Sequence, residues 1–243
     1  MLAETISTIR RALRKVAFLR SAYFFLYTLR QRLGWTRQAV AAEMVRAISD
    51  REDPWGYTTS PDEMERFRSA LNMLESAKVV GRFEHAFEVG CSEGVFTSML
   101  AVHCEDLLAV DISQAALDRA ALRCEGHRVR FEQWDLFNLP APSGLDLVVV
   151  MDVLELYFRP ADVRFGRDKL AGSLRPGGFL LLGNSRQNPV FETAWWAKWM
   201  VRGGKRIAEC FAEHPQLQLL ALETKGIYVN ALFQVKPGIT SPN

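Results

Sequence analysis

The hydrophobic pattern of the chain changes near Phe87. Downstream of it, short runs of apolar and β-branched residues alternate with stretches whose apolar positions recur at helical spacing. This alternation is typical of an α/β fold with a mostly parallel sheet. The pattern predicts strands at 85–90, 107–111, 128–132, 145–151, 178–183, 217–224 and 227–235, and helices at 93–103, 113–123, 160–174 and 203–213.

The residues ahead of this sheet have a helical pattern with one interruption. Segment 53–57, which reads DPWGY, breaks the first helical region. A second helix is expected from Pro61, because Ser60 suits an N-cap and Glu63 follows it three residues later. We therefore expect a helical extension at 1–50, a helical cap at 51–80 and the sheet domain at 81–243.

Charge is concentrated at the N-terminus, although the net charge of the 243 residues is only +2. Residues 1–35 carry seven Arg or Lys and one Glu, which gives +6 and leaves −4 for the remainder. The apolar stretch 16–29 is interrupted by Arg20, is shorter than the roughly 20 residues of a membrane span, and lacks a signal-peptide cleavage pattern. Residues 1–35 are thus expected to form a basic amphipathic helix that contacts an anionic membrane surface, a partner or the protein's own core.

The cysteine and histidine spacing predicts no metal site. Cys91, Cys104, Cys124 and Cys210 form no CxxC pair and have no histidine at the spacing of a zinc ligand. A reduced, cytoplasmic protein is the simplest interpretation, and a homodimer stays open.

The strongest chemical signal is segment 87–100, FEVGCSEGVFTSML, which leads from an expected strand through two glycines into a helix. In a βαβ unit this turn presents backbone N–H groups and the positive end of a helix to a ligand. Gly90 and Gly94 permit a close approach that a Cβ would block, although a glycine pair after a strand is also an ordinary tight turn. Asp111 ends the next strand 21 residues after Gly90, near the separation expected for a carboxylate that binds ribose hydroxyls.

Two acids beside these glycines narrow the choice of ligand. Glu88 and Glu93 bracket the turn, and their charges would repel a pyrophosphate. S-adenosylmethionine is a nucleoside whose sulfonium and ammonium groups tolerate nearby acids, while its carboxylate accepts N–H groups of the turn. An NAD-dependent oxidoreductase is disfavoured, because it would need a third glycine and no acid in the turn.

These features resemble the class I S-adenosylmethionine-dependent methyltransferases, and among them the nodulation-protein-type small-molecule N-methyltransferases, over residues 51–235. The motifs, in order, are Asp53-Pro54-Trp55 with Glu63, Arg66 and Arg68; Glu88, Gly90, Cys91, Gly94, Phe96 and Thr97; Asp111; Asp135; 149–154; and 175–178, RPGG, as the turn into the fifth strand. The resemblance implies a Rossmann-like α/β fold with a mostly parallel seven-stranded sheet flanked by helices. It also implies an enzyme that uses S-adenosyl-L-methionine to methylate an amine or hydroxyl of a small molecule, such as a sugar, an amino sugar or a natural-product intermediate.

The resemblance further implies cofactor contacts from several strand ends. Glu88 and Gly90 line the methionine portion, and Asp111 binds the ribose, unless Asp111 only caps the following helix. The full set of expected cofactor-binding residues is Trp55, Arg66, Glu88, Gly90, Cys91, Gly94, Asp111, Ile112, Trp134, Asp135, Leu136 and Met151.

The resemblance also implies which residues surround the adenine and which residues of the cap cover the cofactor. Asp135, with Trp134 and Leu136, frames the adenine, whereas the alternatives are a surface turn for Asp135 and a core position for Trp134. Trp55 and Tyr57 close over the cofactor from the cap, or serve as hydrophobic plugs.

Candidate catalytic residues follow the fourth strand, where open α/β sheets present their ligands. They are Asp152, Glu155 and Tyr157. Holding acceptor and methyl group about 3–3.5 Å apart supplies much of the rate, and an amine acceptor must also lose a proton. Glu155 is a base, an anchor for a cationic amine, or a simple helix-start carboxylate.

The strand end also departs from the family. The nodulation-type pattern there resembles Glu-Val-Leu-Tyr-Tyr, whereas 152–156 reads DVLEL. We therefore expect an acceptor that differs from a chitin-oligosaccharide amine. Nucleic-acid base methylation is disfavoured, because this segment lacks the Asn/Asp-Pro-Pro-aromatic motif. A non-catalytic S-adenosylmethionine-binding or regulatory protein, and a lipid-linked acceptor at a membrane surface, stay open.

Overall fold

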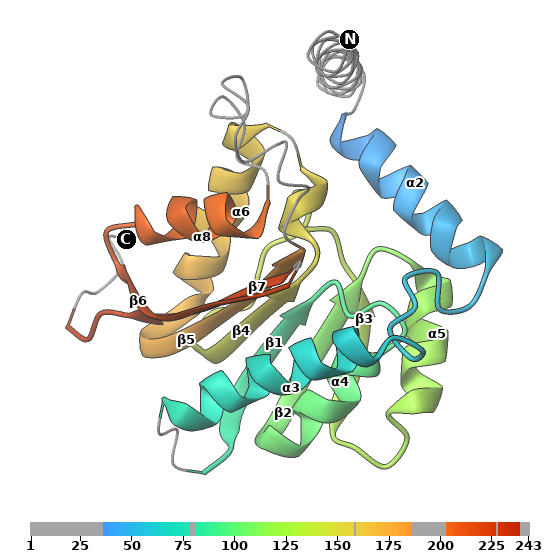
Figure 1. Ribbon diagram of the computed structural model, residues 1–243, viewed down its shortest axis with the longest axis horizontal. Helices are drawn as coiled ribbons and strands as arrows, with labels where there is room; N and C mark the ends of the chain where they lie inside the picture. Colours follow the sequence, from blue (N-terminus) through green and yellow to red (C-terminus); the bar gives the residue numbers. More distant parts are fainter. Residues whose placement is uncertain (1–35, 78–80, 158, 186–202, 227, 239–243) are drawn as a thin grey trace, which may run out of the picture.

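The computed structural model describes residues 36–77, 81–157, 159–185, 203–226 and 228–238 (Figure 1). The basic helix predicted within residues 1–35 lies outside this part of the chain. The predicted division into 1–50, 51–80 and 81–243 stays a prediction.

A seven-stranded sheet forms the centre of the molecule, in the order β3-β2-β1-β4-β5-β7-β6. The first five strands pair in parallel, and β7 pairs antiparallel with β5 and β6. The α/β prediction with a mostly parallel sheet is confirmed. The strands are β1 (Phe83–Val89), β2 (Cys104–Asp111), β3 (Val129–Gln133), β4 (Leu145–Met151), β5 (Leu174–Ser185), β6 (Leu217–Lys225) and β7 (Tyr228–Val235).

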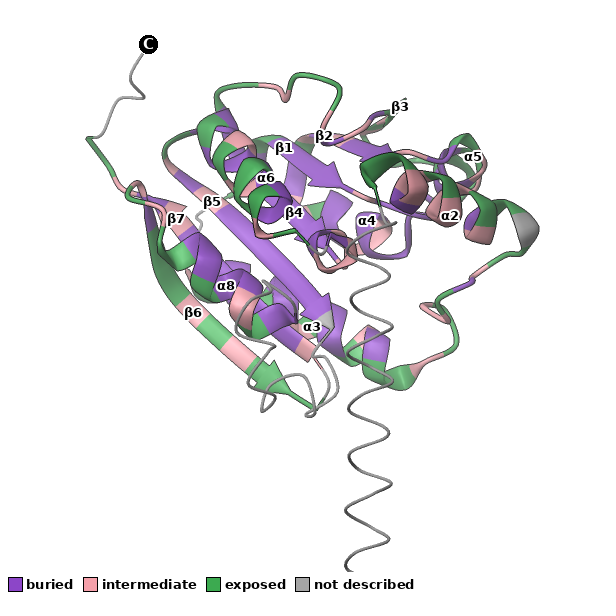
Figure 2. Cartoon of the chain, turned by 90° about the horizontal axis from the view of Figure 1, so that it is seen from above, coloured by how far each residue is buried: buried purple, intermediate pink, exposed green. Residues whose placement is uncertain are grey.

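Helices cover both faces of the sheet (Figure 1). One apolar cluster joins the sheet to α3 (Pro61–Ser76) and α4 (Val95–Leu100), and a small cluster joins β2 to α5 (Gln114–Arg123). The other face packs against α6 (Pro160–Ser173) and α8 (Gly204–Ala212). Figure 2 shows the result: β4 and β5 are buried along most of their length, whereas the edge strand β6 is largely exposed.

Two segments differ from the sequence prediction. The helix expected at 93–103 is α4 followed by a 3-10 turn, η1 (Ala101–His103). It starts at Val95 because Gly94, the residue before it, adopts a left-handed backbone. The fifth strand begins at Leu174, so the expected turn at 175–178 lies within β5, where its pairing with β4 shifts register between Leu145 and Leu147.

The helix α2 (Arg37–Asp50) precedes the loop that leads into α3. Thr36 caps α2 by accepting a hydrogen bond from Ala39 N at 3.2 Å. Ser60 caps α3 by accepting from Glu63 N at 3.4 Å, as its sequence position predicts. The sheet order reverses between β1 and β4, and an open α/β sheet leaves a crevice at the carboxyl ends of such strands.

Candidate functional site

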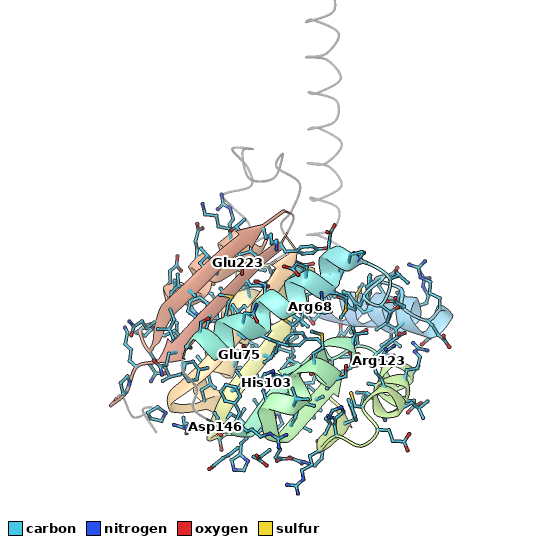
Figure 3. All side chains as sticks on the ribbon, turned by 60° about the horizontal axis from the view of Figure 1, so that its bottom comes forward. Arg68, Glu75, His103, Arg123, Asp146 and Glu223 are labelled. Atoms are coloured by element: carbon cyan, nitrogen blue, oxygen red, sulfur yellow. The ribbon has the colours of Figure 1, made fainter. Side chains whose placement is uncertain are left out.

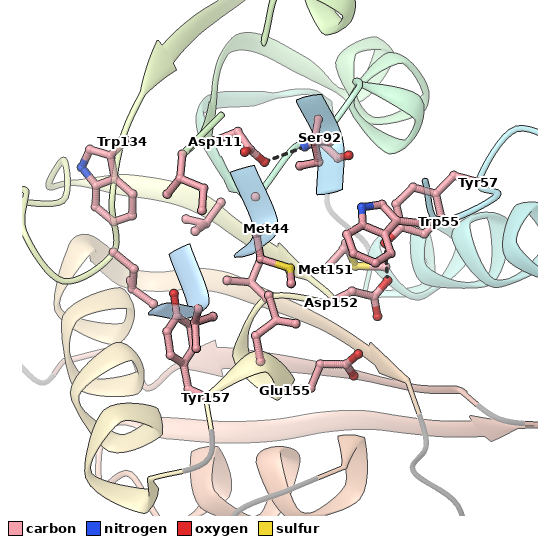
Figure 4. A pocket seen from close by; sticks show the side chains of 18 of the residues that line it. Met44, Trp55, Tyr57, Ser92, Asp111, Trp134, Met151, Asp152, Glu155 and Tyr157 are labelled. Atoms are coloured by element: carbon pink, nitrogen blue, oxygen red, sulfur yellow. Dashed lines mark hydrogen bonds between the residues drawn. The ribbon is translucent and has the colours of Figure 1, made fainter. Parts of the chain in front are cut away.

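A pocket of about 270 Å³ lies at this reversal point (Figure 4). Its walls come from the ends of β1, β2 and β4, from η2 (Leu154–Leu156), and from α2 and the loop after it. The sequence-predicted residues that line it are Trp55, Gly90, Asp111, Ile112, Trp134, Leu136, Met151, Asp152, Glu155 and Tyr157. Arg66, Glu88, Cys91, Gly94 and Asp135 lie outside its lining.

Gly90 allows the chain to pass beneath the end of β4. Its φ is +77°, and a Cβ at this position would lie 2.2 Å from Cγ2 of Val153. Only glycine fits there. The turn's own N–H groups have acceptors within the protein: those of Gly90 and Cys91 donate to Val110 O at 2.8 and 3.0 Å, and that of Ser92 donates to Asp111. These three N–H groups are therefore paired within the protein, and the expected contact of the turn with a ligand carboxylate stays a prediction.

Gly94 and Cys91 serve the packing of α5 rather than the pocket. A Cβ on Gly94 would lie 2.9 Å from Cβ of Ala120 on α5. Cys91 is buried against Ala109 and Leu117, and burial raises the pKa of its thiol well above the ordinary value. The second glycine thus permits a close contact between helices.

Glu88 is a fully buried acid beneath the glycine turn. Its side chain is 1 % exposed, and its Oε2 atom has no hydrogen-bond partner among the described residues. It lines a small cavity of about 20 Å³ that Gly90, Tyr57 and Met151 share. Burial raises the pKa of Glu88 to about 7; the side chain of Thr97 opposes this rise and the charge of Asp111 adds to it. The ionised form of a buried acid of this kind is stabilised by a nearby cation.

Glu93 is occupied by the protein itself. Both of its carboxylate oxygens accept from Asp53 N at 3.0 Å, and Arg119 Nε lies 2.9 Å from Oε1. The carboxylate thereby ties the loop before α3 to α5, and Arg119 compensates its charge. The electrostatic argument against a phosphate ligand therefore depends on Glu88, not on Glu93.

Asp111 connects the end of β2 to the glycine turn. Its Oδ2 accepts from Ser92 N at 2.9 Å and its Oδ1 accepts from Ser113 N at 2.9 Å. Burial raises the pKa of this carboxyl. The residue that caps α5 is Ser113, which accepts from Ala116 N, so the N-cap alternative for Asp111 is wrong. A carboxylate has about four lone-pair sites, so these contacts leave acceptor capacity for a ligand in the pocket.

Trp134 and Leu136 form an apolar wall, and Asp135 between them points elsewhere. The Trp134 ring packs edge-on against Phe87 at 5.3 Å. Asp135 accepts from Phe137 N at 2.7 Å and from Asn138 Nδ2 at 2.8 Å. These bonds are those of a turn residue, which corrects its expected contact with the ligand.

Asp152 is the centre of a buried polar network. It has a left-handed φ of +57°, its Oδ2 accepts from Arg66 Nη2 at 2.5 Å, and the Tyr57 hydroxyl lies 3.2 Å from the same oxygen. Arg66 also donates to Glu63 at 2.7 Å, and Glu63 accepts from the hydroxyl of Tyr228. Burial raises the pKa of Asp152, while the Arg66 guanidinium opposes this. Arg66 therefore orients two pocket carboxylates from behind the pocket wall.

The other two candidate catalytic residues lie on different sides of the pocket (Figure 4). Glu155 lines the wall on the same side as Asp152. Tyr157 lies near Trp134, and its ring packs edge-on against Phe137 at 4.7 Å. Burial raises the pKa of Tyr157, so its hydroxyl stays protonated near neutral pH.

Several lining residues were missed by the sequence analysis. Val40, Met44 and Ile48 of α2 line one side, and their spacing of four residues was a signal for one helix face. Arg37 pairs with Asp162 at 2.7 Å near the start of α2, and Arg119 donates to Ile48 O at 2.6 Å near its end. Glu63, which the sequence marked only as a helix-start and family-motif residue, also lines the pocket. Tyr228 lines it too, and no local pattern marks that residue.

The described residues offer neither a membrane-spanning helix nor a metal-binding cluster. None of the helices there has the length and apolarity needed to cross a membrane. Nor do those residues bring together three His, Cys, Asp or Glu side chains as a metal site would.

Comparisons with known proteins give a consistent picture. The family model of nodulation protein S (NodS) matches residues 37–204. Nodulation protein S of Rhizobium tropici is 33 % identical over 136 residues, which are 56 % of each chain. That of Bradyrhizobium diazoefficiens is 32 % identical over 136 residues, 56 % of this chain and 64 % of the relative. The chain thus spans between about half and two thirds of the length of these curated relatives.

Solved structures extend the similarity over more of the chain. The N-methyltransferase NodS from Bradyrhizobium japonicum WM9, in complex with S-adenosyl-L-homocysteine, superposes with a TM-score of 0.68 at 25 % identity. The match covers 81 % of this chain and 98 % of that one.

A more distant relative by sequence is carboxy-S-adenosyl-L-methionine synthase of Vibrio vulnificus, which is 29 % identical over 132 residues, 51 % of each chain. Because the NodS family model matches more than half of the residues of this chain, the chain belongs to the nodulation protein S family.

Proposed function

We propose that this protein is an S-adenosylmethionine-dependent methyltransferase that acts on a small-molecule amine. The observation that carries the proposal is the buried carboxylate of Glu88, whose Oε2 atom has no hydrogen-bond partner among the described residues, beneath a turn that only glycine can form at Gly90. A ligand with a positively charged end fits this arrangement, whereas a phosphate does not. The solved relative that contains S-adenosyl-L-homocysteine supports the same ligand class.

The remaining pocket residues divide between the two ends of this cofactor. The spare lone pairs of Asp111 suit the ribose hydroxyls, and the apolar side chains of Ile112, Trp134 and Leu136 suit the adenine. Trp55 and α2 exclude water from above. When bound, the cofactor supplies a methyl group on a cationic sulfur, which is a good leaving group.

The acceptor side of the pocket is acidic. Glu63, Asp152 and Glu155 all line it, and the buried Arg66 pairs with Glu63 and Asp152. Three carboxylates at this end of the pocket favour an acceptor that arrives as an ammonium ion. We assign Glu155 to bind the ammonium and accept its proton, and Asp152 to hold Tyr57 in place. Tyr157 contributes to the wall near the adenine.

The size of the pocket bears on the kind of partner. A pocket of about 270 Å³ suits a small molecule rather than a nucleic acid. Contact of residues 1–35 with a membrane or a partner stays a prediction, because those residues lie outside the described part of the chain. A homodimer and a cytoplasmic location also stay predictions.

The proposal is tested with the full chain. Calorimetric titration with S-adenosylmethionine and S-adenosyl-L-homocysteine measures binding, and transfer of a labelled methyl group to matched panels of amines and alcohols measures turnover. We expect binding of both ligands and transfer to amines over alcohols. Absence of binding would contradict the methyltransferase assignment, and binding without transfer across both panels would favour a regulatory protein.

A further inference from the structure

A second cavity adjoins the pocket. It has a volume of about 230 Å³ and lies between α3 and the β6–β7 hairpin. Figure 3 shows α3 beside this hairpin, with Glu223 labelled on β6. Among the described residues, Tyr228 alone lines both this cavity and the main pocket.

Tyr228 is held as a wall by two contacts. Its hydroxyl donates to Glu63 on the side of the main pocket, and the Arg66 guanidinium lies 4.7 Å from its ring centroid. Because Arg66 is also bonded to Asp152, the position of the Tyr228 ring is coupled to the acceptor end of the main pocket. A ring fixed at both its edge and its face is a rigid barrier.

The lining of the second cavity combines apolar surface with charged and amide groups. Asp62, Glu65 and Glu223 contribute carboxylates, and Asn230 is 4 % exposed with an Oδ1 atom that has no partner among the described residues. On its outer side, Lys225 pairs with Glu65 at 2.8 Å across the gap between β6 and α3. Such a lining suits a hydroxyl- or amine-bearing chain.

We propose that Tyr228 sets the maximum length of the acceptor by separating the main pocket from the second cavity. The inference builds on the proposed function, since it concerns the acceptor of the same site. With Tyr228 in place, the acceptor ends at the ring. With the ring removed, the two cavities join, and a longer amine can extend its polar end toward Glu223 and Asn230.

The test compares Tyr228→Ala, Tyr228→Val and Tyr228→Phe with the unmodified full chain. Valine keeps the β-branched character of the strand position and serves if the alanine variant is poorly folded. Phenylalanine keeps the wall and removes only the bond to Glu63. The ligands are linear amino alcohols of graded length, measured by calorimetric binding to protein loaded with S-adenosyl-L-homocysteine and, separately, as methyl acceptors.

We expect Tyr228→Ala and Tyr228→Val to shift the ratio of long-chain to short-chain affinity by roughly tenfold or more toward the long chains. Phenylalanine should keep the ratio of the unmodified protein. The inference is overturned if folded Tyr228→Ala and Tyr228→Val keep the ratio of the unmodified protein. It is also overturned if Tyr228→Phe shifts the ratio as much as they do. If the unmodified protein binds the amino alcohols without methylating any of them, the proposed function fails, and the binding ratios still decide the role of Tyr228.

Discussion

The hydroxyl of Tyr57 lies 3.2 Å from Oδ2 of Asp152, the oxygen that Arg66 also approaches at 2.5 Å. Tyr57 belongs to the loop after α2, Arg66 to α3, and Asp152 directly follows β4. One carboxylate therefore connects the segment that covers the pocket to the carboxyl edge of the sheet. Its left-handed backbone, uncommon for aspartate, is typical of a residue held in place for function.

The substitution Asp152→Asn tests this connection through stability. It leaves the buried Arg66 with one carboxylate partner instead of two, and we expect the free energy of unfolding to fall by about 3 kcal/mol. Urea denaturation measures the loss. The control Asp118→Asn changes an exposed carboxylate that accepts from Gln114, and should stay within about 0.5 kcal/mol. Equal stability of both variants would contradict a structural role for the network.

The substitution Glu155→Gln tests the proposed base. The amide cannot accept a proton from an ammonium ion, so we expect kcat to fall about 100-fold or more while the affinity for S-adenosyl-L-homocysteine stays within about twofold. Steady-state kinetics and calorimetry measure the two quantities. The control Glu125→Gln, at an exposed position after α5, should change neither. A kcat equal to that of the unmodified protein would remove Glu155 from the mechanism.

The substitution Gly90→Ala tests the close approach at the first strand. The new Cβ would meet Val153 at 2.2 Å, in addition to the strain of φ +77°. Gly126→Ala isolates the strain alone, because φ is +87° there and nothing lies within 4 Å of the added Cβ. We expect a loss of about 1 kcal/mol for Gly126→Ala, and about 1–3 kcal/mol more, with weakened cofactor binding, for Gly90→Ala. Similar losses in both would show that space at Gly90 is not limiting.

Glu88 predicts a specific dependence of stability on pH. Its pKa is raised from 4.5 to about 7, so between these values the folded protein holds a proton that the unfolded chain has lost. The free energy of unfolding therefore falls as the pH rises through this window, by about 3 kcal/mol in total. We expect Glu88→Gln to remove this contribution, as measured by urea denaturation at several pH values.

Two comparisons complete that experiment. Glu84→Gln, at an exposed position on the same strand, should keep the pH profile of the unmodified protein. Affinity for the cationic cofactor should rise with pH through about 7, because the cation favours the ionised carboxylate, and Glu88→Gln should flatten this rise. A pH profile of stability shared by the unmodified protein and Glu88→Gln would mean that Glu88 does not titrate in this range.

The substitution Met44→Ala tests the contribution of α2. Met44 lines the pocket between Val40 and Ile48, and losing its side chain removes apolar surface from the cofactor's cover. We expect the affinity for S-adenosyl-L-homocysteine to fall by about tenfold, as measured by calorimetry. Glu43→Ala, which removes the partner of Arg46 on the same helix, should leave the affinity unchanged. Unchanged affinity in Met44→Ala would place α2 outside the binding site.

Much of this architecture is predictable from local patterns. Strand and helix positions follow from hydrophobic periodicity, and the position of Gly90 at the end of a buried strand marks the ligand-facing turn. Ser60 also identifies the start of α3, because N-capping depends on neighbours along the chain. The four-residue spacing of Val40, Met44 and Ile48 was equally available as a local signal, although only the fold shows that this face covers the pocket.

The sequence by itself determined the α/β class, the order of the strands' hydrophobic runs and the acidic glycine turn, because each depends on residues close together in the chain. Only the tertiary structure decided that Glu93 pairs with Arg119, that Gly94 makes room for α5, and that Tyr228 reaches Glu63. Those contacts join segments that are distant in sequence. Which of them form depends on strand order and helix packing, and neither is encoded in the spacing of neighbouring residues.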